Sequence, residues 1–416
     1  MSTQSVPLQE LPCLRLQGSM LLHSSGMKKR KPALVEGLDS ECTPTSGASL
    51  QWSPPLKHQR VTDKGKENEE NRFVLGRRSR RRKETRTGIS WDALPDELIL
   101  TVLVFLPLHD LLRVSVVCRR WHRLVSDQSL WISVDLEGLT HSGPALQSVL
   151  NTGVSRLRCP RCCVDQMLFS GSGPLQMVEM DLSSSIIPPS ALQSIVSRCR
   201  RLQRLSLEGL TLSDAILESL ALNSNLQQVN LSGCSGFSAS ALSDMLRRCS
   251  SVEQLNVSWC DFSREHVEAV VANVSSAVTQ LNLSGYRESL TLNEVTILVE
   301  RCPRIQTLDL SDSTLLTAES FSVLEELKFL HHLSLSRCYN IHLAALTDLG
   351  RTLPALVLLD VFGLLQDTQL QSLKKEMTHV SINARPFSSI ARPTPSSALS
   401  GDPTMWGRRC RLSIRV

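Results

Sequence analysis

An apolar pattern that recurs every 24 to 27 residues constrains the fold of this chain more than any other feature of its sequence. In each copy, large apolar residues occupy the first, fourth and sixth of six consecutive positions. A repeat of this length cannot bury its apolar face alone, so neighbouring copies must stack and share one continuous core. Eight copies end at Leu182, Leu207, Leu231, Val257, Leu283, Leu310, Leu335 and Val361, and weaker copies end at Cys159 and Ile382.

The pattern is the leucine-rich-repeat signature, in which each copy contributes one strand and one helix to a solenoid. It predicts an α/β fold for residues 136–383, with a parallel sheet on the concave face and helices on the convex face. Side chains that alternate with the apolar ones face outward, and here they are small and polar, as in Gln228, Asn230 and Ser232. We find no Ser/His/Asp triad in register, no paired carboxylates and no glycine-rich phosphate loop. The sequence therefore predicts a protein that is not an enzyme and needs no cofactor.

Six cysteines keep a fixed register with the repeats. Three of them follow the last apolar residue of a copy by three positions, and three precede the first apolar residue of the next copy by three: Cys234, Cys260 and Cys338, then Cys199, Cys249 and Cys302. We expect these thiols to be small buried apolar groups where the chain enters and leaves each strand.

A second group of cysteines, Cys159, Cys162 and Cys163 in the sequence CPRCC, has the spacing of half a zinc site. A closed zinc site needs four ligands, usually as two spaced pairs, and no second pair follows. We therefore predict no metal site and interpret these residues as buried or surface thiols, which are reduced in a chain without an export signal.

The loops that follow four consecutive repeats carry large side chains of a different kind. These residues lie two to four positions past the last apolar residue of their repeat: Trp259, Tyr286, Arg287, Asp312, Arg337 and Tyr339. Neighbouring strands lie about 4.8 Å apart, so the six side chains should gather along one short edge of the sheet. Exposed Trp, Tyr and Arg are the usual hot-spot residues of binding surfaces. The alternative is that the aromatic side chains only cover the core beneath the loops.

Residues 89–135 are predicted to form a compact all-helical module. Leu98, Val102 and Phe105 form one helical stripe, but the residues between them are also apolar, and Pro107 should end this helix. A unit of about 45 residues cannot bury so many large apolar side chains alone. Either the rest of the chain or a partner must cover them.

The two ends of the chain differ from the body in charge. Residues 1–88 have a net charge of +8 and residues 384–416 of +5, which leaves −8 for residues 89–383. An acidic body argues against a nucleic-acid surface there, and no apolar run approaches the roughly 20 residues of a membrane helix. We expect 1–88 to be a disordered arm, whose basic runs at 28–31 and 77–83 suit nuclear import and whose KEN sequence at 66–68 matches a short degron.

Beyond Ile382 the chain cannot continue the solenoid, because it has several prolines and no further repeat pattern. We predict that the tail, 384–416, folds back along the concave face. Ile390 or Pro393 should then pack over the small Ser and Asn side chains of the sheet.

The helical module resembles an F-box, and an F-box followed by cysteine-type leucine-rich repeats is typical of one family of proteins. The stretch WDALPDELILTVLVFLPLHDLLRVSVVCRRWHRLVSDQSLW carries the resemblance through its LPDEL opening, Cys118, Trp121 and the final Trp131. Phrases such as LNLSGCSGFS and WGRRCRL extend it to about Arg411.

The resemblance implies a substrate receptor of a ubiquitin ligase, present in nucleus and cytoplasm. Its F-box would bind the Skp adaptor of a cullin-RING scaffold, with contacts or supports from Leu94, Pro95, Glu97, Leu98, Leu111, Leu112 and Trp121. Its repeats would recruit phosphorylated Kip-type kinase inhibitors, alone or with cyclin–kinase complexes, for proteasomal degradation in the cell cycle. A small Cks accessory protein would share the edge that contains Trp259, Arg287, Asp312, Arg337 and Tyr339. The alternative is a free-standing repeat protein that binds or inhibits a partner without any ligase.

Overall fold

The computed structural model describes residues 91–137, 139, 142–164, 169, 171, 173–393, 404–406 and 408–413. Every described element belongs to one compact unit, Ser90–Val416. The predicted arm, its basic runs and the KEN sequence lie outside the described residues. Among the helices of the described ranges, none combines the length and the apolarity that crossing a bilayer requires.

Three short helices form the N-terminal module, as the sequence predicted: α1 (Asp96–Leu103), α2 (Leu108–Ser115) and α3 (Arg119–Val125), with single 3-10 turns at Trp91–Ala93 and Gln128–Leu130. Pro107 separates α1 from α2, because its ring cannot enter a continuing helix. Ile99, Leu111 and Leu124 are among the buried residues that fill the centre of the module.

The guanidinium group of Arg120, on α3, forms hydrogen bonds with residues at the start of the module. Arg120 donates from Nε to Asp96 Oδ1 at 2.8 Å and from Nη1 to the carbonyl oxygens of Trp91 and Asp92 at 3.1 and 3.2 Å. The hydrogen bond from Arg120 lowers the pKa of Asp96 below its usual range. The Trp91 ring lies edge-on to that of Trp121, with centroids 5.4 Å apart.

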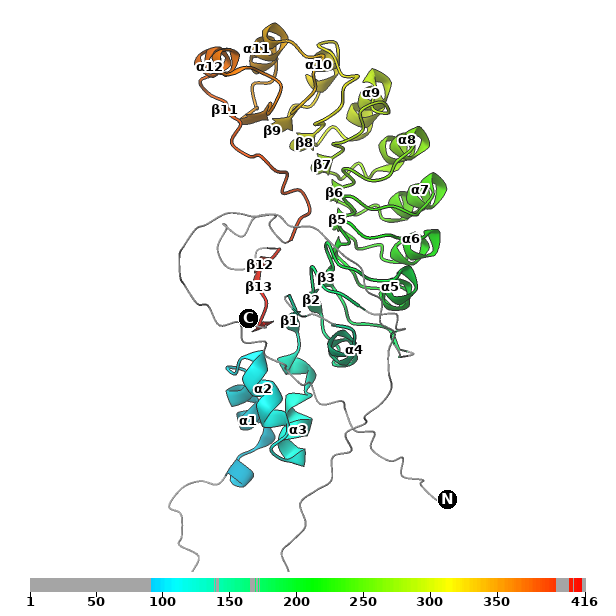
Figure 1. Ribbon diagram of the computed structural model, residues 1–416, viewed down its shortest axis with the longest axis vertical. Coiled ribbons are helices and arrows are strands. Elements are labelled where there is room, and N and C mark those ends of the chain that lie inside the picture. The colour runs from blue at the N-terminus through cyan, green and yellow to red at the C-terminus, as the bar shows by residue number, and fades with distance from the viewer. Residues whose placement is uncertain are drawn as a thin grey trace, which may run out of the picture. The chain divides into compact units, whose positions relative to one another are not determined.

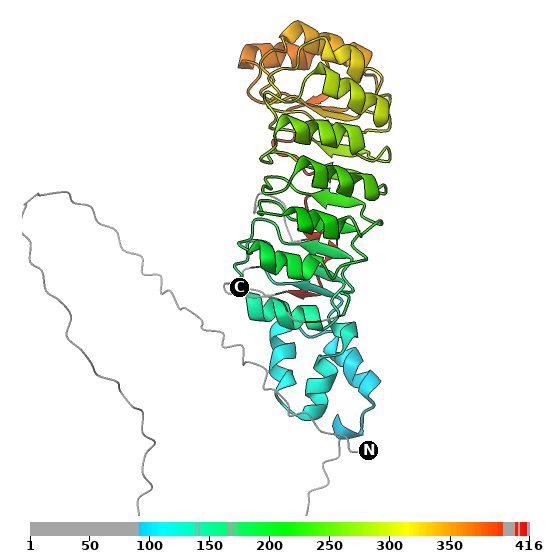
Figure 2. The same cartoon turned by 90° about the vertical axis from the view of Figure 1, so that its right-hand side faces the viewer.

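The repeats form one sheet of twelve strands, and helices cover its convex side (Figures 1 and 2). Its strands, in spatial order, are β11 (Ser381–Ile382), β10 (Leu358–Asp360), β9 (His332–Ser334), β8 (Thr307–Asp309), β7 (Gln280–Asn282), β6 (Gln254–Asn256), β5 (Gln228–Asn230), β4 (Arg204–Ser206), β3 (Glu179–Asp181), β2 (Arg156–Arg158), β1 (Ser133–Asp135) and β14 (Leu412–Ser413). The convex helices are α4 (Gly143–Asn151), α5 (Pro189–Val196), α6 (Asp214–Leu220), α7 (Ala239–Arg248), α8 (Arg264–Asn273), α9 (Leu292–Arg301), α10 (Ser320–Leu324), α11 (Leu343–Thr352) and α12 (Asp367–Glu376). The α/β fold class is confirmed.

Every pair of neighbouring strands in this sheet is parallel, and the central apolar residues of successive repeats face one another. Leu205 pairs with Val229, Val229 with Leu255, and Leu255 with Leu281. The predicted burial of the six in-register cysteines is confirmed, since each is at most 9% exposed.

The polar residue that ends each central strand stabilises the turn after it. The side-chain oxygens of Asn256, Asn282 and Asp309 accept hydrogen bonds of 2.9 to 3.1 Å from the backbone N–H two residues later. This local bond is the usual use of Asn and Asp at turns. It explains why Asn or Asp so often stands at this position of the repeat.

The tail lies along the concave face and reaches the opposite end of the sheet (Figure 1). Asn256 donates from Nδ2 to the carbonyl oxygen of Ile390 at 3.1 Å, and Ile390 is 2% exposed. Arg392 donates to Glu208 at 3.0 Å and to Ser232 at 3.1 Å. Further on, β12 (Thr404–Met405) and β13 (Arg408–Arg409) pair with each other, and β14 then adds to the sheet beside β1.

Candidate functional site

An apolar face of the helical module, called here the module face, is open to solvent. It consists of Leu98, Val102, Phe105, Val116 and Val117. Phe105 is 85% exposed and Val116 is 82% exposed, although both are large apolar residues in a small helical unit. Large apolar side chains left this exposed on one small helical unit are typical of sites of protein association.

The residues predicted to contact the adaptor divide between this face and the interior. Leu98 lies on the module face, Pro95 and Glu97 are exposed beside it at the start of α1, and Leu94, Leu112 and Trp121 are half-buried. Leu111 is completely buried, so of the two predicted roles, contact or support, its position fits only the support. The predicted set omitted four residues of the module face: Val102, Phe105, Val116 and Val117.

The second surface is the edge where the strands end, called here the loop edge. The residue two positions past the last apolar residue has a left-handed backbone in nine consecutive repeats: Arg161, Ser184, Gly209, Gly233, Trp259, Gly285, Asp312, Arg337 and Gly363. The N–H at this position donates to a carbonyl of the next repeat, as from Trp259 to Ser284 at 3.0 Å. Glycine fills the position most cheaply, since a side chain costs roughly 1 kcal/mol in a left-handed backbone. Trp259, Asp312 and Arg337 adopt the left-handed conformation despite that cost. Backbone strain of this kind is concentrated at functional sites.

Two of these large side chains lie over a glycine of the next repeat. A Cβ atom built on Gly285 would come within 2.9 Å of the Trp259 ring. A Cβ atom built on Gly363 would come within 3.2 Å of Cγ of Arg337. The glycines therefore provide the space in which the indole and the arginine stem are held, while the indole stays 49% exposed.

Asp312 positions the arginines of the loop edge. Arg337 donates from Nε to Asp312 Oδ1 at 2.8 Å and from Nη2 to the other carboxylate oxygen, and Arg287 lies 3.7 Å away. The Asp312 side chain is only 1% exposed, so the predicted contact at this edge cannot come from Asp312 itself. The hydrogen bonds to the Asp312 carboxylate raise the pKa of Arg337. The Arg337 side chain remains 43% exposed.

The two tyrosines of the chain occupy different environments. Tyr339 is 59% exposed on the loop edge, next to Arg337. Tyr286 is 4% exposed, stacks on Phe262 with ring centroids 5.3 Å apart and donates its hydroxyl hydrogen to the carbonyl of Val257. Tyr286 as a surface contact was therefore wrong: it occupies the inward position that Cys260 fills one repeat earlier.

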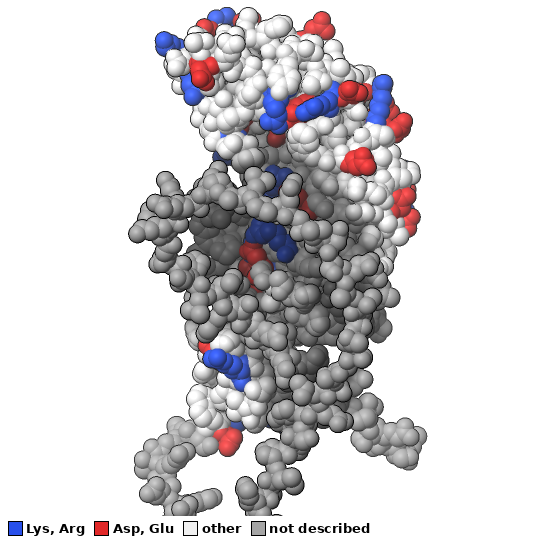
Figure 3. Space-filling view, in the orientation of Figure 1, with Lys and Arg blue, Asp and Glu red and all other residues white. Residues whose placement is uncertain are grey.

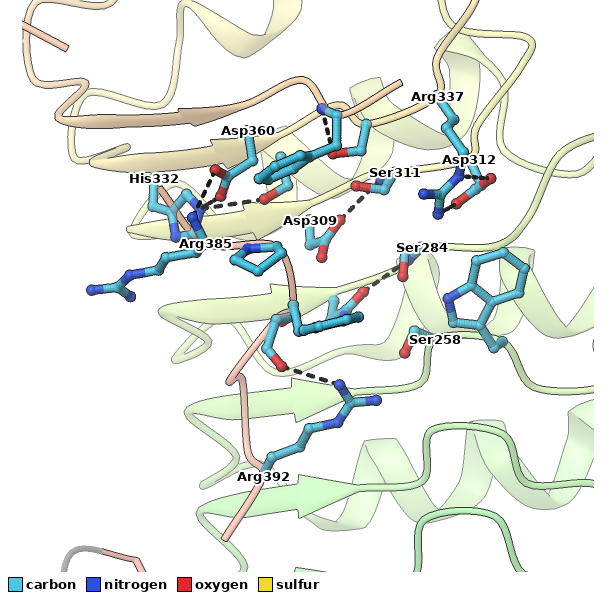
Figure 4. A pocket seen from close by; sticks show the side chains of 18 residues that line it. Ser258, Ser284, Asp309, Ser311, Asp312, His332, Arg337, Asp360, Arg385 and Arg392 are labelled. Atoms are coloured by element: carbon cyan, nitrogen blue, oxygen red, sulfur yellow. Dashed lines mark hydrogen bonds and ion pairs between the residues drawn. The ribbon is translucent and has the colours of Figure 1, made fainter. Parts of the chain in front are cut away.

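A cavity of about 240 Å³ joins the loop edge to the tail (Figure 4). Trp259, Asp312 and Arg337 line one side of it, and Arg385, Pro386, Phe387, Ser388 and Arg392 of the tail line the other. Its floor is the sheet: Ser258, Asn282, Ser284, Asp309, Ser311, His332, Ser334, Ser336, Asp360 and Phe362. Phe387 is 66% exposed, so an aromatic side chain stands on each side of a polar floor.

Charge on this side of the molecule is mixed. Where the described residues are in view, basic and acidic side chains lie next to each other (Figure 3). Within the described ranges, no group of three or more His, Cys, Asp or Glu side chains is placed to hold a metal ion. The described surface is suited to mixed polar and apolar contacts.

A helical module with an open apolar face, followed by a solenoid of leucine-rich repeats, defines the class of protein. Comparison with protein families matches residues 91–137 to the F-box-like model and residues 144–413 to the model described as SKP2 LRR domain. The second match covers well over half of the chain. The chain belongs to the F-box/leucine-rich-repeat family, in the group that this SKP2-type repeat domain defines.

Curated relatives agree with this assignment over part of the chain. The chain is 34% identical to F-box/LRR-repeat protein 12 of Homo sapiens over 142 residues, which is 34% of this chain and 39% of that protein. The Mus musculus protein gives the same values, and the Bos taurus protein is 33% identical over 30% of this chain and 36% of its own length. The match spans about two-fifths of these relatives. Among solved structures, the Chaetomium Mex67:Mtr2 subunits match 26% of this chain and 83% of theirs, with 18% identity and a TM-score of 0.22.

Proposed function

We propose that this protein is the substrate-recognition subunit of a Skp–cullin–F-box ubiquitin ligase. F-box/leucine-rich-repeat proteins are generally non-catalytic adaptors, and the proposed role needs no chemistry from the chain. It holds a substrate near a ubiquitin-charged enzyme and thereby raises the effective concentration of the reacting groups.

The observation that carries the proposal is the module face. Phe105, Val116 and Val117 are each at least 65% exposed, and burying an apolar side chain of this size contributes roughly 1.5–3 kcal/mol. A monomer gains nothing by leaving them in water, whereas an adaptor helix or groove that covers them gains that free energy. Leu98 and Val102 extend the same face along α1.

The loop edge and the cavity beside it are the proposed recognition surface. Trp259 and Tyr339 supply exposed aromatic area, and Arg337 supplies a guanidinium that Asp312 holds in place. The proposed ligands are a Cks accessory protein and a phosphorylated Kip-type kinase inhibitor. Because Asp312 occupies two nitrogens of Arg337, this edge is a weak phosphate site alone, and the accessory protein would hold most of the phosphate.

The test is co-purification followed by titration. The full chain should bring down the Skp adaptor and the cullin scaffold, and the Cks protein with a phosphopeptide should bind more tightly as a pair than separately. Binding of the pair by a chain that retains no adaptor would favour a free-standing repeat protein instead. We also propose that the protein acts in nucleus and cytoplasm, which fractionation or imaging of the tagged full chain would test.

A further inference from the structure

Two thiols for which the proposed function has no use lie together in the turn after β2. Cys159 directly follows this strand and is fully buried, and Cys162 is 2% exposed. Pro160 and Arg161 form the turn between them, and Arg161 has the left-handed φ of 54° that recurs along the loop edge. Both thiols are thus buried at the two ends of one four-residue turn.

This turn already has the shape that a disulfide requires. A β-turn brings the Cα atoms of its first and fourth residues within about 7 Å, and a disulfide spans Cα atoms roughly 4.4–6.8 Å apart. Pro160 fixes the first corner of the turn and the left-handed Arg161 the second. The two sulfur atoms can therefore be joined with little movement of the backbone.

The hydroxyl group of Ser185, one repeat further on, holds both ends of the turn. It accepts a hydrogen bond from the N–H of Cys162 at 3.1 Å, lies 3.2 Å from Sγ of Cys162 and donates to the carbonyl of Cys159 at 3.2 Å. On the far side, Ser142 donates from its N–H to the carbonyl of Cys163 at 3.1 Å.

These hydrogen bonds make the two thiols unequal. The hydrogen bond from Cys159, with others from Ser185 and Ser142, lowers the pKa of Cys162 to about 6. The same thiol–thiol bond, together with burial, raises the pKa of Cys159. By contrast, burial raises the pKa of Cys249 and Cys302 to about 11. Reactive cysteines differ from inert buried ones in this way, because the thiolate is the nucleophile.

We propose that Cys159 and Cys162 form a redox site, which a peroxide oxidises to an intramolecular disulfide. The Cys162 thiolate attacks one oxygen of hydrogen peroxide, the O–O bond breaks, and Cys162 sulfenic acid and hydroxide form. The Cys159 sulfur then attacks the sulfenic sulfur, the S–O bond breaks, and the Cys159 proton leaves with that oxygen as water. Two thiols lose two electrons, and the peroxide is reduced to two waters.

The burial of the pair selects the oxidant. Hydrogen peroxide is close to water in size, so the small exposed part of Cys162 is enough for it to reach the sulfur. A glutathione disulfide must bring a whole tripeptide to the sulfur it exchanges with, and Cys162 does not offer that access. The proposal does not depend on the ligase role, since it concerns only the chemistry of the turn.

Trypsin makes the test direct, because cleavage after Arg158 and Arg161 places Cys159 and Cys162 on separate peptides. The full chain is treated with hydrogen peroxide, its free thiols are alkylated, and the digest is examined by mass spectrometry without reduction. We expect the peptide 159–161 to be linked to the peptide that starts at Cys162, and oxidised glutathione to give much less of this product. A wild-type digest in which both cysteines remain alkylated after peroxide treatment would overturn the proposal.

Single substitutions assign the partners. Cys163→Ser should keep the linkage, whereas Cys162→Ser should lose it, and Cys159→Ser should stop at a sulfenic acid that dimedone traps on Cys162. Linkage that survives in Cys162→Ser but not in Cys163→Ser would assign the chemistry to Cys163 and refute the proposed pair. Circular dichroism melting of each variant, with Cys→Ala counterparts, shows that the fold is retained. The wild-type digest shows whether the linkage forms, and the variants show which cysteine forms it.

Discussion

Arg337 donates from Nε to Oδ1 of Asp312 at 2.8 Å, although the two residues occupy the same left-handed position in consecutive repeats. The acid is buried and the base is half-exposed, so the carboxylate fixes a guanidinium that faces solvent. A bidentate pair of this kind is more directional than a lysine would be. Asp312 is thus a positioning residue for the loop edge.

Reversing the charge of Arg337 should damage recognition without unfolding the repeats. We expect Arg337→Glu to weaken binding of the Cks protein with phosphopeptide by about 2 kcal/mol or more, the scale of hot-spot residues. The measurement is a calorimetric titration of the pair onto wild type and variant. Adaptor binding serves as the control and should be unchanged; wild-type affinity for the pair would place recognition elsewhere.

Gly285→Ala should displace the Trp259 indole. The new methyl group would meet the ring at 2.9 Å, and the φ of Gly285 is +100°, which disfavours any side chain. We expect a loss of stability of about 1 kcal/mol or more, together with weaker binding at the loop edge. Chemical denaturation and the same titration measure the two effects. Gly173→Ala is the matched control, because its Cβ atom meets nothing within 4 Å; equal behaviour of the two variants would contradict the prediction.

Phe105→Ala and Leu111→Ala should separate binding from stability in the helical module. Phe105 is 85% exposed, so its truncation should reduce adaptor affinity at least tenfold and leave the unfolding curve unchanged. Leu111 is fully buried, so its truncation should cost roughly 2–5 kcal/mol of stability. Adaptor pull-down and thermal melts of the full chain make the comparison. Undiminished adaptor binding by Phe105→Ala would mean that the module face is not the contact.

Asp309→Asn should change how stability depends on pH. Burial raises the pKa of Asp309 above its ordinary value of 3.8, so between the two values the folded state binds more protons than the unfolded state. The wild-type free energy of unfolding therefore falls as pH rises through this window, and Asn removes that contribution. Urea titrations at several pH values from 3 upward, with the variant alongside, test this. The wild-type curve should fall relative to that of the variant, and parallel curves would contradict the raised pKa.

The repeat register could be predicted from sequence because one spacing rule sets both the apolar core and the positions between. The same rule explains the error at Tyr286: the residue stands three positions past the last apolar residue of its repeat, where Cys234, Cys260 and Cys338 are buried. Tyr286 was predicted to bind a partner because exposed tyrosines often do so. Its position within the repeat, however, places its side chain in the core. The burial of Asp312 could not be predicted in this way. Its side chain pairs with Arg337 of the next repeat, and the spacing of apolar residues does not reveal such a contact.

The start of the sheet was missed for a related reason. The first strand, β1, lies inside residues 89–135, which were predicted to be the helical module. The apolar spacing of a repeat is present there in Trp131, Val134 and Leu136. It was overlooked because Trp131 also matches the end of the F-box pattern. Helix α1 has apolar residues on all of its faces, so its sequence does not show which face is exposed. Only the packing of Ile99 and Leu103 against α2 and α3 leaves Leu98, Val102 and Phe105 in water.

The pairing of Val134 with Leu412 has a consequence for synthesis of the protein. A leucine-rich solenoid can form repeat by repeat as the chain leaves the ribosome, because each repeat contacts only its neighbours. Here the first strand, β1, waits for β14, which follows all the repeats in the chain, before its open edge is covered. Until then the nascent chain presents an unpaired strand edge, a template for pairing with other chains. This pairing joins the strands that lie farthest apart in the sequence of the sheet, so it has the longest loop to close, and deleting Leu412 and Ser413 would leave the edge of β1 uncovered.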